Sequence, residues 1–347
     1  MGFSECGGFE VVFANDIDQD AGQTFAYNHP GVATYVGDIK KLTKKRVESD
    51  IGRSDIDVVV GGPPCQAYST AGKRLLSDGR AWMFRQYHRI LEEFRPKVFL
   101  FENVTGLLSM RAKDGGEKLF DHIVGVLGNL GYDVSWKVLD ASEHGVPQKR
   151  RRVFVVGTRT GAGFEFPPPL SERKLTLRDA LGDLPVNAPP RGKRAGYASG
   201  PSNAFQESMR RGAPGSILYH SGSSHGESLM KVIRAIPKNG GRAVDAPGTI
   251  RPSSGFGNSY ARLWWDRPST TITRNLGTPS SARCIHPEAD RALTTREGAR
   301  LQSFPDRYRF FGTPSSKNLQ IGNAVPPVLA GRMAEAVLRH LEGRKNV

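Results

Sequence analysis

The chain has 347 residues, of which 38% are hydrophobic and 24% charged, so it can bury a sizeable core in one large domain or two. No apolar run approaches the roughly 18 residues of a membrane span. The first residues also lack the pattern of a secretory signal, so we expect a cytoplasmic protein without a membrane partner. The three cysteines, Cys6, Cys65 and Cys284, show neither pairing nor metal-ligand spacing, which argues against a disulfide framework and a metal site.

The charge points to a class of partner. Lys and Arg number 49 against 34 Asp and Glu, which gives a net charge of +15. Such an excess favours a polyanion, most often nucleic acid, because basic side chains that neutralise phosphates release counterions. A protein that is merely basic is the alternative at this point.

The first half of the chain alternates predicted strands and helices. Apolar, β-branched runs predict strands over residues 9–14, 56–60, 97–101, 132–139 and 152–158. Helical spacing of apolar residues predicts helices over 82–94 and 117–130. This alternation predicts an α/β fold with a doubly wound, mostly parallel sheet in a first domain, residues 1–166.

Composition changes at Phe166-Pro167-Pro168-Pro169. We expect a smaller domain over residues 167–317, whose variable part, about 167–266, is rich in Gly, Pro, Ser and Arg. A helix is predicted over 293–304. Residues 318–347 are expected to return to the first domain and to include an amphipathic helix over 326–341.

Three predicted strands end in residues that can carry chemistry. The ends are Asn15-Asp16, Pro63-Pro64-Cys65 and Glu102-Asn103-Val104. In a doubly wound sheet these ends open on one edge, where ligands bind. Each is weak alone, since a carboxylate after a strand is often a helix cap and a lone cysteine is usually packing. Together they predict an acid and a thiol in one crevice.

Five ordered motifs resemble those of the cytosine-5 DNA methyltransferases. They are Gly62-Pro63-Pro64-Cys65-Gln66-Ala67-Tyr68-Ser69, Glu102-Asn103-Val104, Gln148-Lys149-Arg150-Arg151-Arg152, residues 296–305 (REGARLQSFP) and residues 320–327 (QIGNAVPP). The resemblance covers nearly the whole chain apart from the variable part. It implies a methyltransferase fold with a target-recognition domain.

The resemblance assigns the catalytic residues. Cys65 would supply a thiolate that adds to carbon 6 of cytosine and makes carbon 5 nucleophilic. Glu102 would engage ring N3, which requires a raised pKa in a dry pocket. Arg152 would contact the cytosine carbonyl oxygen, Arg150 would support the same wall, and Asn103 belongs to the same catalytic group. Since duplex DNA hides its bases, the target cytosine would have to be flipped out.

The resemblance also implies S-adenosylmethionine as the methyl donor. Asp16 would hold the ribose hydroxyls, Ile17 would pack on the adenine, and Asp38 would accept from the adenine amino group. The complete expected cofactor set is Asp16, Ile17, Asp38, Ile39, Pro63, Met83, Asn323 and Ala324. The implied partner is double-stranded DNA in a bacterial modification system, with a restriction endonuclease acting on the same site as a possible second partner.

The N-terminal region departs from the family pattern. Family members begin with a strand that runs into a Phe-x-Gly-x-Gly-Gly loop, which cups the cofactor. Here Gly2-Phe3 matches the end of the following helix and Gly7-Gly8-Phe9 the turn into the second strand, so the glycine loop has no counterpart. Either the true start lies upstream, or the product is truncated and binds the cofactor weakly.

Two other functions remain open from the sequence. One is a catalytically silent DNA-binding protein descended from the enzyme. The other is methylation of cytosine in RNA, although the Cys-Phe-Thr signature of that subfamily is not found in the variable part. A nicotinamide dehydrogenase is disfavoured because the chain shows no Gly-x-Gly-x-x-Gly turn.

Overall fold

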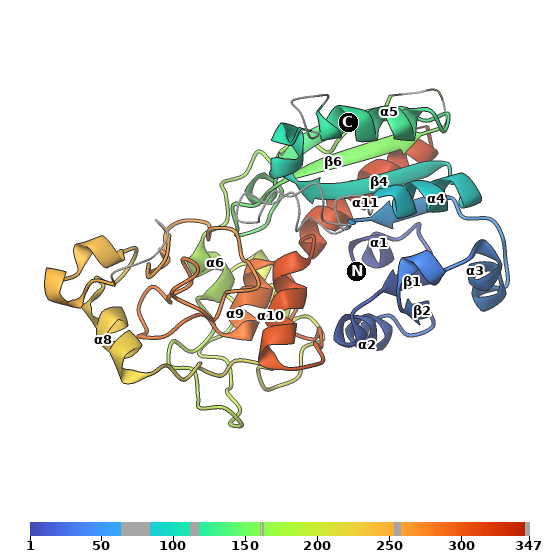
Figure 1. Cartoon of the computed structure of the whole chain (residues 1–347). Helices are drawn as coiled ribbons and strands as arrows, with labels where there is room; N and C mark the ends of the chain where they lie inside the picture. Colours follow the sequence, from blue (N-terminus) through green and yellow to red (C-terminus); the bar gives the residue numbers. More distant parts are fainter. Residues whose placement is uncertain (64–83, 112–117, 160, 162, 253–257, 344–347) are drawn as a thin grey trace.

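The structure is a computed structural model of the chain, and it describes residues 1–63, 84–111, 118–159, 161, 163–252 and 258–343 (Figure 1). The predicted site residues Cys65 and Met83 lie outside these ranges. The strands are β1 (Phe13–Asp16), β2 (Ala33–Val36), β3 (Val58–Gly61), β4 (Val98–Val104), β5 (Asp133–Asp140) and β6 (Arg151–Thr158). The helices are α1 (Gly2–Glu5), α2 (Gln19–Asn28), α3 (Lys44–Ile51), α4 (Phe84–Phe94), α5 (Leu119–Gly128), α6 (Leu177–Leu181), α7 (Ala204–Arg210), α8 (Glu227–Ala235), α9 (Thr295–Leu301), α10 (Pro314–Asn323) and α11 (Pro327–Leu341). Short 3-10 turns span Ile39–Lys41, Thr105–Ser109, Ala141–Glu143, Ala243–Asp245 and Gly248–Ile250.

The larger sheet has the strand order β3-β4-β6-β5. Strand β4 is parallel to β3, whereas β6 is antiparallel to both of its neighbours. It follows that β3, β4 and β5 run in one direction and β6 alone is reversed. The prediction of a mostly parallel α/β sheet is thereby confirmed.

Strands β1 and β2 form a separate parallel pair. Within the described residues, β1 and β3 are therefore not hydrogen-bonded to each other. The strand predicted over 9–14 begins later, at Phe13. The reason is packing: Phe9 contacts the ring of Phe3 at a centroid distance of 5.0 Å, and both pack on the hydrophobic cluster that includes α11.

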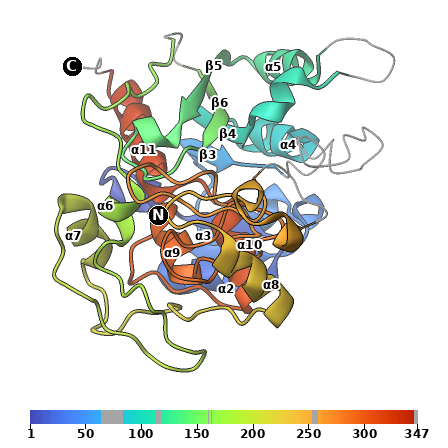
Figure 2. The ribbon, with the colours of Figure 1, turned by 90° about the vertical axis from the view of Figure 1, so that its left-hand side faces the viewer.

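Helices cover both faces of the larger sheet, as Figure 2 shows with α11 on one side and α4 and α5 on the other. Successive strand residues point to opposite faces. Accordingly Phe99 and Phe101 pack in the cluster that includes α4 and α5, while Val98 and Leu100 pack in the cluster that includes α11. This two-sided burial is what a doubly wound fold requires.

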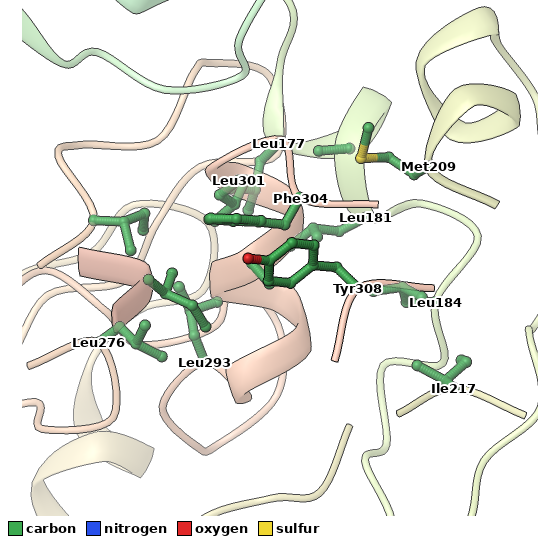
Figure 3. Packing of buried hydrophobic residues seen from close by; sticks show 14 of the residues in the cluster. Leu177, Leu181, Leu184, Met209, Ile217, Leu276, Leu293, Leu301, Phe304 and Tyr308 are labelled. Atoms are coloured by element: carbon green, nitrogen blue, oxygen red, sulfur yellow. The ribbon is translucent and has the colours of Figure 1, made fainter. Parts of the chain in front are cut away.

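The region predicted as a smaller domain contains a hydrophobic cluster of its own (Figure 3). Leu177 and Leu181 of α6 pack there with Leu301, Phe304 and residues further along the chain. Helix α6 starts with a capping box in which Thr176 and Asp179 satisfy each other's backbone N–H. The variable part is thus folded where it is described.

Several arginines are structural. Six are buried among the described residues: Arg150, Arg262, Arg283, Arg291, Arg296 and Arg300. Arg300 donates to Asp306 and to Asp183, both of them also buried. Part of the basic excess therefore holds the fold together and is not available to a polyanion. In the described part of the chain, no helix is long and apolar enough to cross a membrane.

Candidate active site

The ends of β3 and β4 bring Gly62 and Pro63, which lie a few residues before the predicted nucleophile Cys65, beside the predicted acid Glu102. The two strands are parallel with Gly61 opposite Phe101, so residues 62–63 follow beside Glu102 and Asn103. Asn103 Nδ2 donates to the carbonyl of Pro63 at 3.3 Å, and a methyl group added at Gly62 would lie 3.4 Å from Glu102 Oε2. The backbone leading towards Cys65 is therefore fixed to the strand that carries Glu102.

Glu102 and Arg152 form a cross-strand pair. Val104 lies opposite Arg152 in the antiparallel β4–β6 register, so Glu102 is its diagonal neighbour on the same face. Arg152 Nε lies 3.1 Å from Glu102 Oε1, and the two side chains are only 15% and 12% exposed. Burial raises the pKa of Glu102, against the opposing pull of the Arg152 and Arg150 charges.

The carboxyl of Glu102 keeps an unused acceptor. Its Oε1 is buried and accepts no hydrogen bond from the described residues, despite the nearby guanidinium. Buried polar atoms are nearly always hydrogen-bonded, so an exception marks a functional group that awaits a partner. A protonated carboxyl at this place can donate one hydrogen bond to a ligand atom.

Arg150 is hydrogen-bonded to other segments of the chain than Arg152, which pairs with Glu102. Its guanidinium is buried and donates to the carbonyls of Ile272 at 3.1 Å and Gly322 at 3.0 Å. These bonds make Arg150 a brace between β6, the segment around Ile272 and the end of α10. It influences Glu102 by its charge, because it lowers the pKa of that carboxyl.

The predicted adenosine residues gather at the carboxyl ends of β1 and β2. Gly37 N donates to the carbonyl of Asp16 at 2.8 Å, which places Asp38 one residue from this contact. Both carboxylates are oriented by backbone donors: Asp16 Oδ1 accepts from Asp18 N and Asp38 Oδ1 accepts from Lys40 N, each at 2.9 Å. Burial raises the pKa of Asp16.

Apolar and amide side chains complete this edge. Ile17 is 72% exposed beside Asp16, and Ile39, which follows Asp38, is half-buried. Asn15 was not predicted as a site residue. Its Nδ2 donates to the carbonyls of Tyr35 at 3.0 Å and Gly37 at 2.9 Å, and so locks the two strand ends together. The only signal in the sequence was a short polar residue at the end of an apolar strand.

The residues expected at the amino-acid end of the cofactor lie on another element. Asn323 is exposed at the last turn of α10, and Ala324 is its C-cap. Among the described residues, Asn323 and Ala324 form no hydrogen bond or ion pair with Asp16 or Asp38. The two oriented carboxylates and the exposed Ile17 fit the adenosine part of S-adenosylmethionine, where Asp16 would accept from the ribose hydroxyls and Asp38 from the adenine amino group. In the described ranges, no cluster of His, Cys, Asp or Glu could hold a metal ion.

A sheet with helices on both faces, polar residues at its strand ends and a buried acid beside Gly62 and Pro63 is typical of proteins that bind a nucleotide-like cofactor. The profile of the family "C-5 cytosine-specific DNA methylase" matches residues 1–339. The chain belongs to this family, as its motifs predicted, and it is an enzyme of the DNA (cytosine-5-)-methyltransferase class.

Relatives agree with this assignment. The chain is 34% identical to the Type II methyltransferase M.AgeI of Thalassovita gelatinovora, over 97% of this chain and 95% of the relative. It is also 34% identical to the Type II methyltransferase M1.HphI of Haemophilus parahaemolyticus, over 98% of this chain and 83% of the relative.

Solved structures show the same fold. A putative DNA modification methyltransferase encoded within a prophage of E. coli superposes with a TM-score of 0.78 at 26% identity, covering 98% of this chain and 96% of the other. The Dnmt2 methyltransferase of S. pombe has a TM-score of 0.61 at 18% identity, over 98% and 94% of the two chains. The second likeness concerns the fold alone.

Proposed function

We propose that the protein transfers a methyl group from S-adenosylmethionine to carbon 5 of a flipped cytosine in double-stranded DNA, through a covalent adduct with Cys65. The observation that supports this most directly is the state of Glu102. It is a buried carboxyl with a raised pKa and an unused oxygen, held beside the backbone that leads to Cys65. Such a group can present a proton to N3 of a cytosine.

The chemistry assigns one task to each side chain. The Cys65 thiolate forms a bond to carbon 6, and the electron pair of the C5–C6 double bond moves into the ring as N3 takes a proton from Glu102. Carbon 5 is then nucleophilic. S-adenosylmethionine, when bound, supplies the electrophilic methyl group. Loss of the proton from carbon 5 to solvent, release of the thiolate from carbon 6 and return of the N3 proton to Glu102 restore the aromatic ring and both side chains.

Asp16, Ile17, Asp38 and Ile39 would hold the adenosine part of the cofactor, and Asn323 and Ala324 its amino-acid end. Arg152 is well placed for a second task, because its guanidinium lies beside the acid that binds N3 and can donate to the neighbouring carbonyl oxygen of the base. Pro63 and Met83 would border the same pocket. The base reaches this pocket only after it leaves the DNA stack.

The DNA partner follows from the family, and the surface arginines and lysines would bind its phosphates. We propose that residues 167–266 read the bases. Since relatives are named Type II methyltransferases, we further propose that the protein modifies DNA in a bacterial cell, at the nucleoid, and protects a site that a cognate restriction endonuclease cuts.

Bisulfite sequencing of DNA from cells that express the protein tests activity and reveals the target site together. We expect complete protection of one cytosine within a short sequence, and no protection with Cys65→Ser. Purified protein should also form a stable complex with 5-fluorocytosine duplex DNA in the presence of cofactor. Full methylation by Cys65→Ser, or labelling of transfer RNA alone, would contradict the proposal.

A further inference from the structure

Two fully buried glutamines connect the segment before β6 to Ile272, to the end of α9 and to the end of α10. Gln148 precedes β6 and Gln302 follows α9, and both side chains are 0% exposed. Burying two primary amides is costly unless every polar atom finds a partner. The hydrogen-bond partners of these two amides therefore indicate which segments they hold together.

The side-chain amides of Gln148 and Gln302 form a chain of hydrogen bonds in which the NH2 group of Gln148 donates to Gln302. Gln148 Oε1 accepts from the backbone N–H of Ile272 at 2.8 Å, and its Nε2 donates to Gln302 Oε1 at 2.9 Å and to the carbonyl of Leu301 at 3.0 Å. Gln302 Nε2 then donates to the carbonyls of Ile321 at 2.6 Å and Ala324 at 3.3 Å. All four donor hydrogens have an acceptor within reach, and each amide polarises the next. We call these two residues the amide pair.

The amide pair connects two segments with different tasks. On one side, Ile272 ends a stretch that pairs with the residues leading into β6. Ser269 forms a parallel β-bridge with Gln148, and Thr271 Oγ1 donates to the carbonyl of Lys149 at 2.8 Å. This stretch directly follows the variable part that we propose reads DNA. On the other side are the carbonyls of Ile321 and Ala324, which flank Asn323 at the end of α10.

Arg150 spans the same two segments. Its guanidinium donates to the carbonyls of Ile272 and Gly322 and so forms a second connection beside the amide pair. The end of α10 is therefore joined to the stretch around Ile272 by two buried side-chain routes, and the backbone of Gly322 also packs directly against Thr273 and Arg274. A displacement of one segment would be transmitted to the other through these buried hydrogen bonds.

We propose that the amide pair couples DNA engagement to cofactor binding: Gln148 and Gln302 are positioning residues that set the backbone of residues 321–324 according to the placement of residues 269–272. This proposal rests on the function proposed above. It implies that DNA tightens cofactor binding and that the cofactor tightens DNA binding by the same factor.

The test measures binding and not turnover. S-adenosylhomocysteine is titrated into the full-length protein with and without a duplex carrying the site found by bisulfite sequencing. For the wild type we expect the duplex to tighten binding by at least fivefold, the lower end of typical couplings. Gln302→Met keeps the shape of the side chain but removes the amide, and the factor should fall to less than twofold. Gln320→Met is the control and should keep the wild-type factor, because among the described residues the Gln320 amide donates to the Phe311 carbonyl and to Ser316 Oγ, not to residues 269–272.

A double-mutant cycle separates coupling from general loosening. If the amide pair acts as a unit, Gln148→Met combined with Gln302→Met loses no more coupling than Gln302→Met alone. If Gln148→Met fails to fold, the comparison of the coupling factors of Gln302→Met and Gln320→Met still tests the inference. A wild type without coupling, or a Gln302→Met variant that keeps it, overturns the inference. Absence of methylation in the bisulfite experiment contradicts the proposed function, whereas a methylating wild type without coupling contradicts the inference alone.

Discussion

Arg152 Nε lies 3.1 Å from Glu102 Oε1, and nevertheless the pKa of Glu102 is raised. Desolvation is the largest cause and outweighs the attraction of the two nearby arginines. The sheet therefore holds the acid in its protonated form to a higher pH than a free glutamate would keep it. That is the form required to donate a proton to a ring nitrogen.

Replacing Glu102 by Gln should separate activity from stability. We expect methyl transfer to fall by about 10²–10⁴-fold, the usual contribution of a positioned acid. Because the folded pKa lies above the unfolded one, the contribution of Glu102 to stability is greatest below the unfolded pKa and declines as pH rises through the folded pKa. Glu102→Gln removes this cost, so at pH 8 the variant should unfold at a temperature no lower than the wild type. Single-turnover methylation and thermal unfolding measure the two effects.

Glu92→Gln provides the matched control, because Glu92 is exposed on α4 and should change neither quantity. The wild-type methylation rate should also decline on the alkaline side as Glu102 loses its proton. A Glu102→Gln variant that is clearly less stable at pH 8 would show that the charged form is net favourable, contrary to the direction of the pKa shift.

Asn103 offers a test of how the Cys65 loop is positioned. Asn103→Asp keeps the acceptor for Val104 N but replaces the donor to the Pro63 carbonyl by an oxygen that repels it. We expect trapping of 5-fluorocytosine DNA to slow on the order of 10²-fold, because small displacements of reacting groups are expensive. Stopped-time gel analysis of the adduct measures the rate. Asn129→Asp, at an exposed position after α5, should trap DNA at the wild-type rate. Equal rates for both variants would remove Asn103 from the positioning of the loop.

The sequence identified what depends on long apolar runs. Residues 97–101 and 152–158 are rich in β-branched and aromatic side chains, and β4 and β6 were found there with small shifts of their ends. The sequence did not predict β2. This strand has four residues and pairs with β1, and an apolar pattern of that length is too short to be distinguished from chance.

Side-chain roles within motifs were harder to predict. Arg150 and Arg152 are two residues apart and were expected on the same wall of the site, but Arg150 is buried against Ile272 and Gly322 while Arg152 lies beside Glu102. Which of them faces the site depends on how β6 emerges from its contact with residues 269–272. That contact is made by residues more than a hundred positions away along the chain, and no local pattern encodes it. The same holds for Gln148 and Gln302.

Asn15 should control cofactor affinity although it is not expected to touch the cofactor. Asn15→Ala removes two hydrogen bonds that join the ends of β1 and β2, and it leaves Asp16 and Asp38 free to drift apart. Two net hydrogen bonds are worth about 1–3 kcal/mol, so we expect a dissociation constant for S-adenosylhomocysteine raised by roughly tenfold or more. Calorimetric titration measures it. An unchanged constant, with Asp16→Ala strongly weakened, would show that the strand ends keep their spacing without Asn15.

The Arg291–Glu297 pair predicts how acid weakens the protein. Glu297 is buried, accepts two hydrogen bonds from Arg291, and has its pKa lowered from 4.5 to about 2. Its contribution to stability is therefore complete above pH 4.5 and disappears as pH falls through about 2. Urea unfolding should show Glu297→Gln less stable than wild type at pH 7, with the gap closing below pH 4. A gap that is constant with pH would exclude titration of Glu297 as its cause. The exposed Glu227→Gln should show no gap.

The buried arginines should contribute to the fold far more than exposed ones. Arg300 has 0% side-chain exposure and satisfies both Asp183 and Asp306, which are equally buried. Among the described residues, Arg300→Met would leave Asp183 and Asp306 only longer contacts to a cation, to Arg210 at 3.5 Å and to Arg296 at 3.6 Å, and breaking a buried pair in this way costs about 3–5 kcal/mol. Arg234→Met removes an ion pair to Glu227 in which both partners are more than half exposed, and such pairs contribute about 1 kcal/mol at most. Urea unfolding of the two variants under identical conditions measures the difference. Comparable losses would mean that water or rearranged donors compensate Asp183 and Asp306, and the region around α9 would then not depend on Arg300 for its stability.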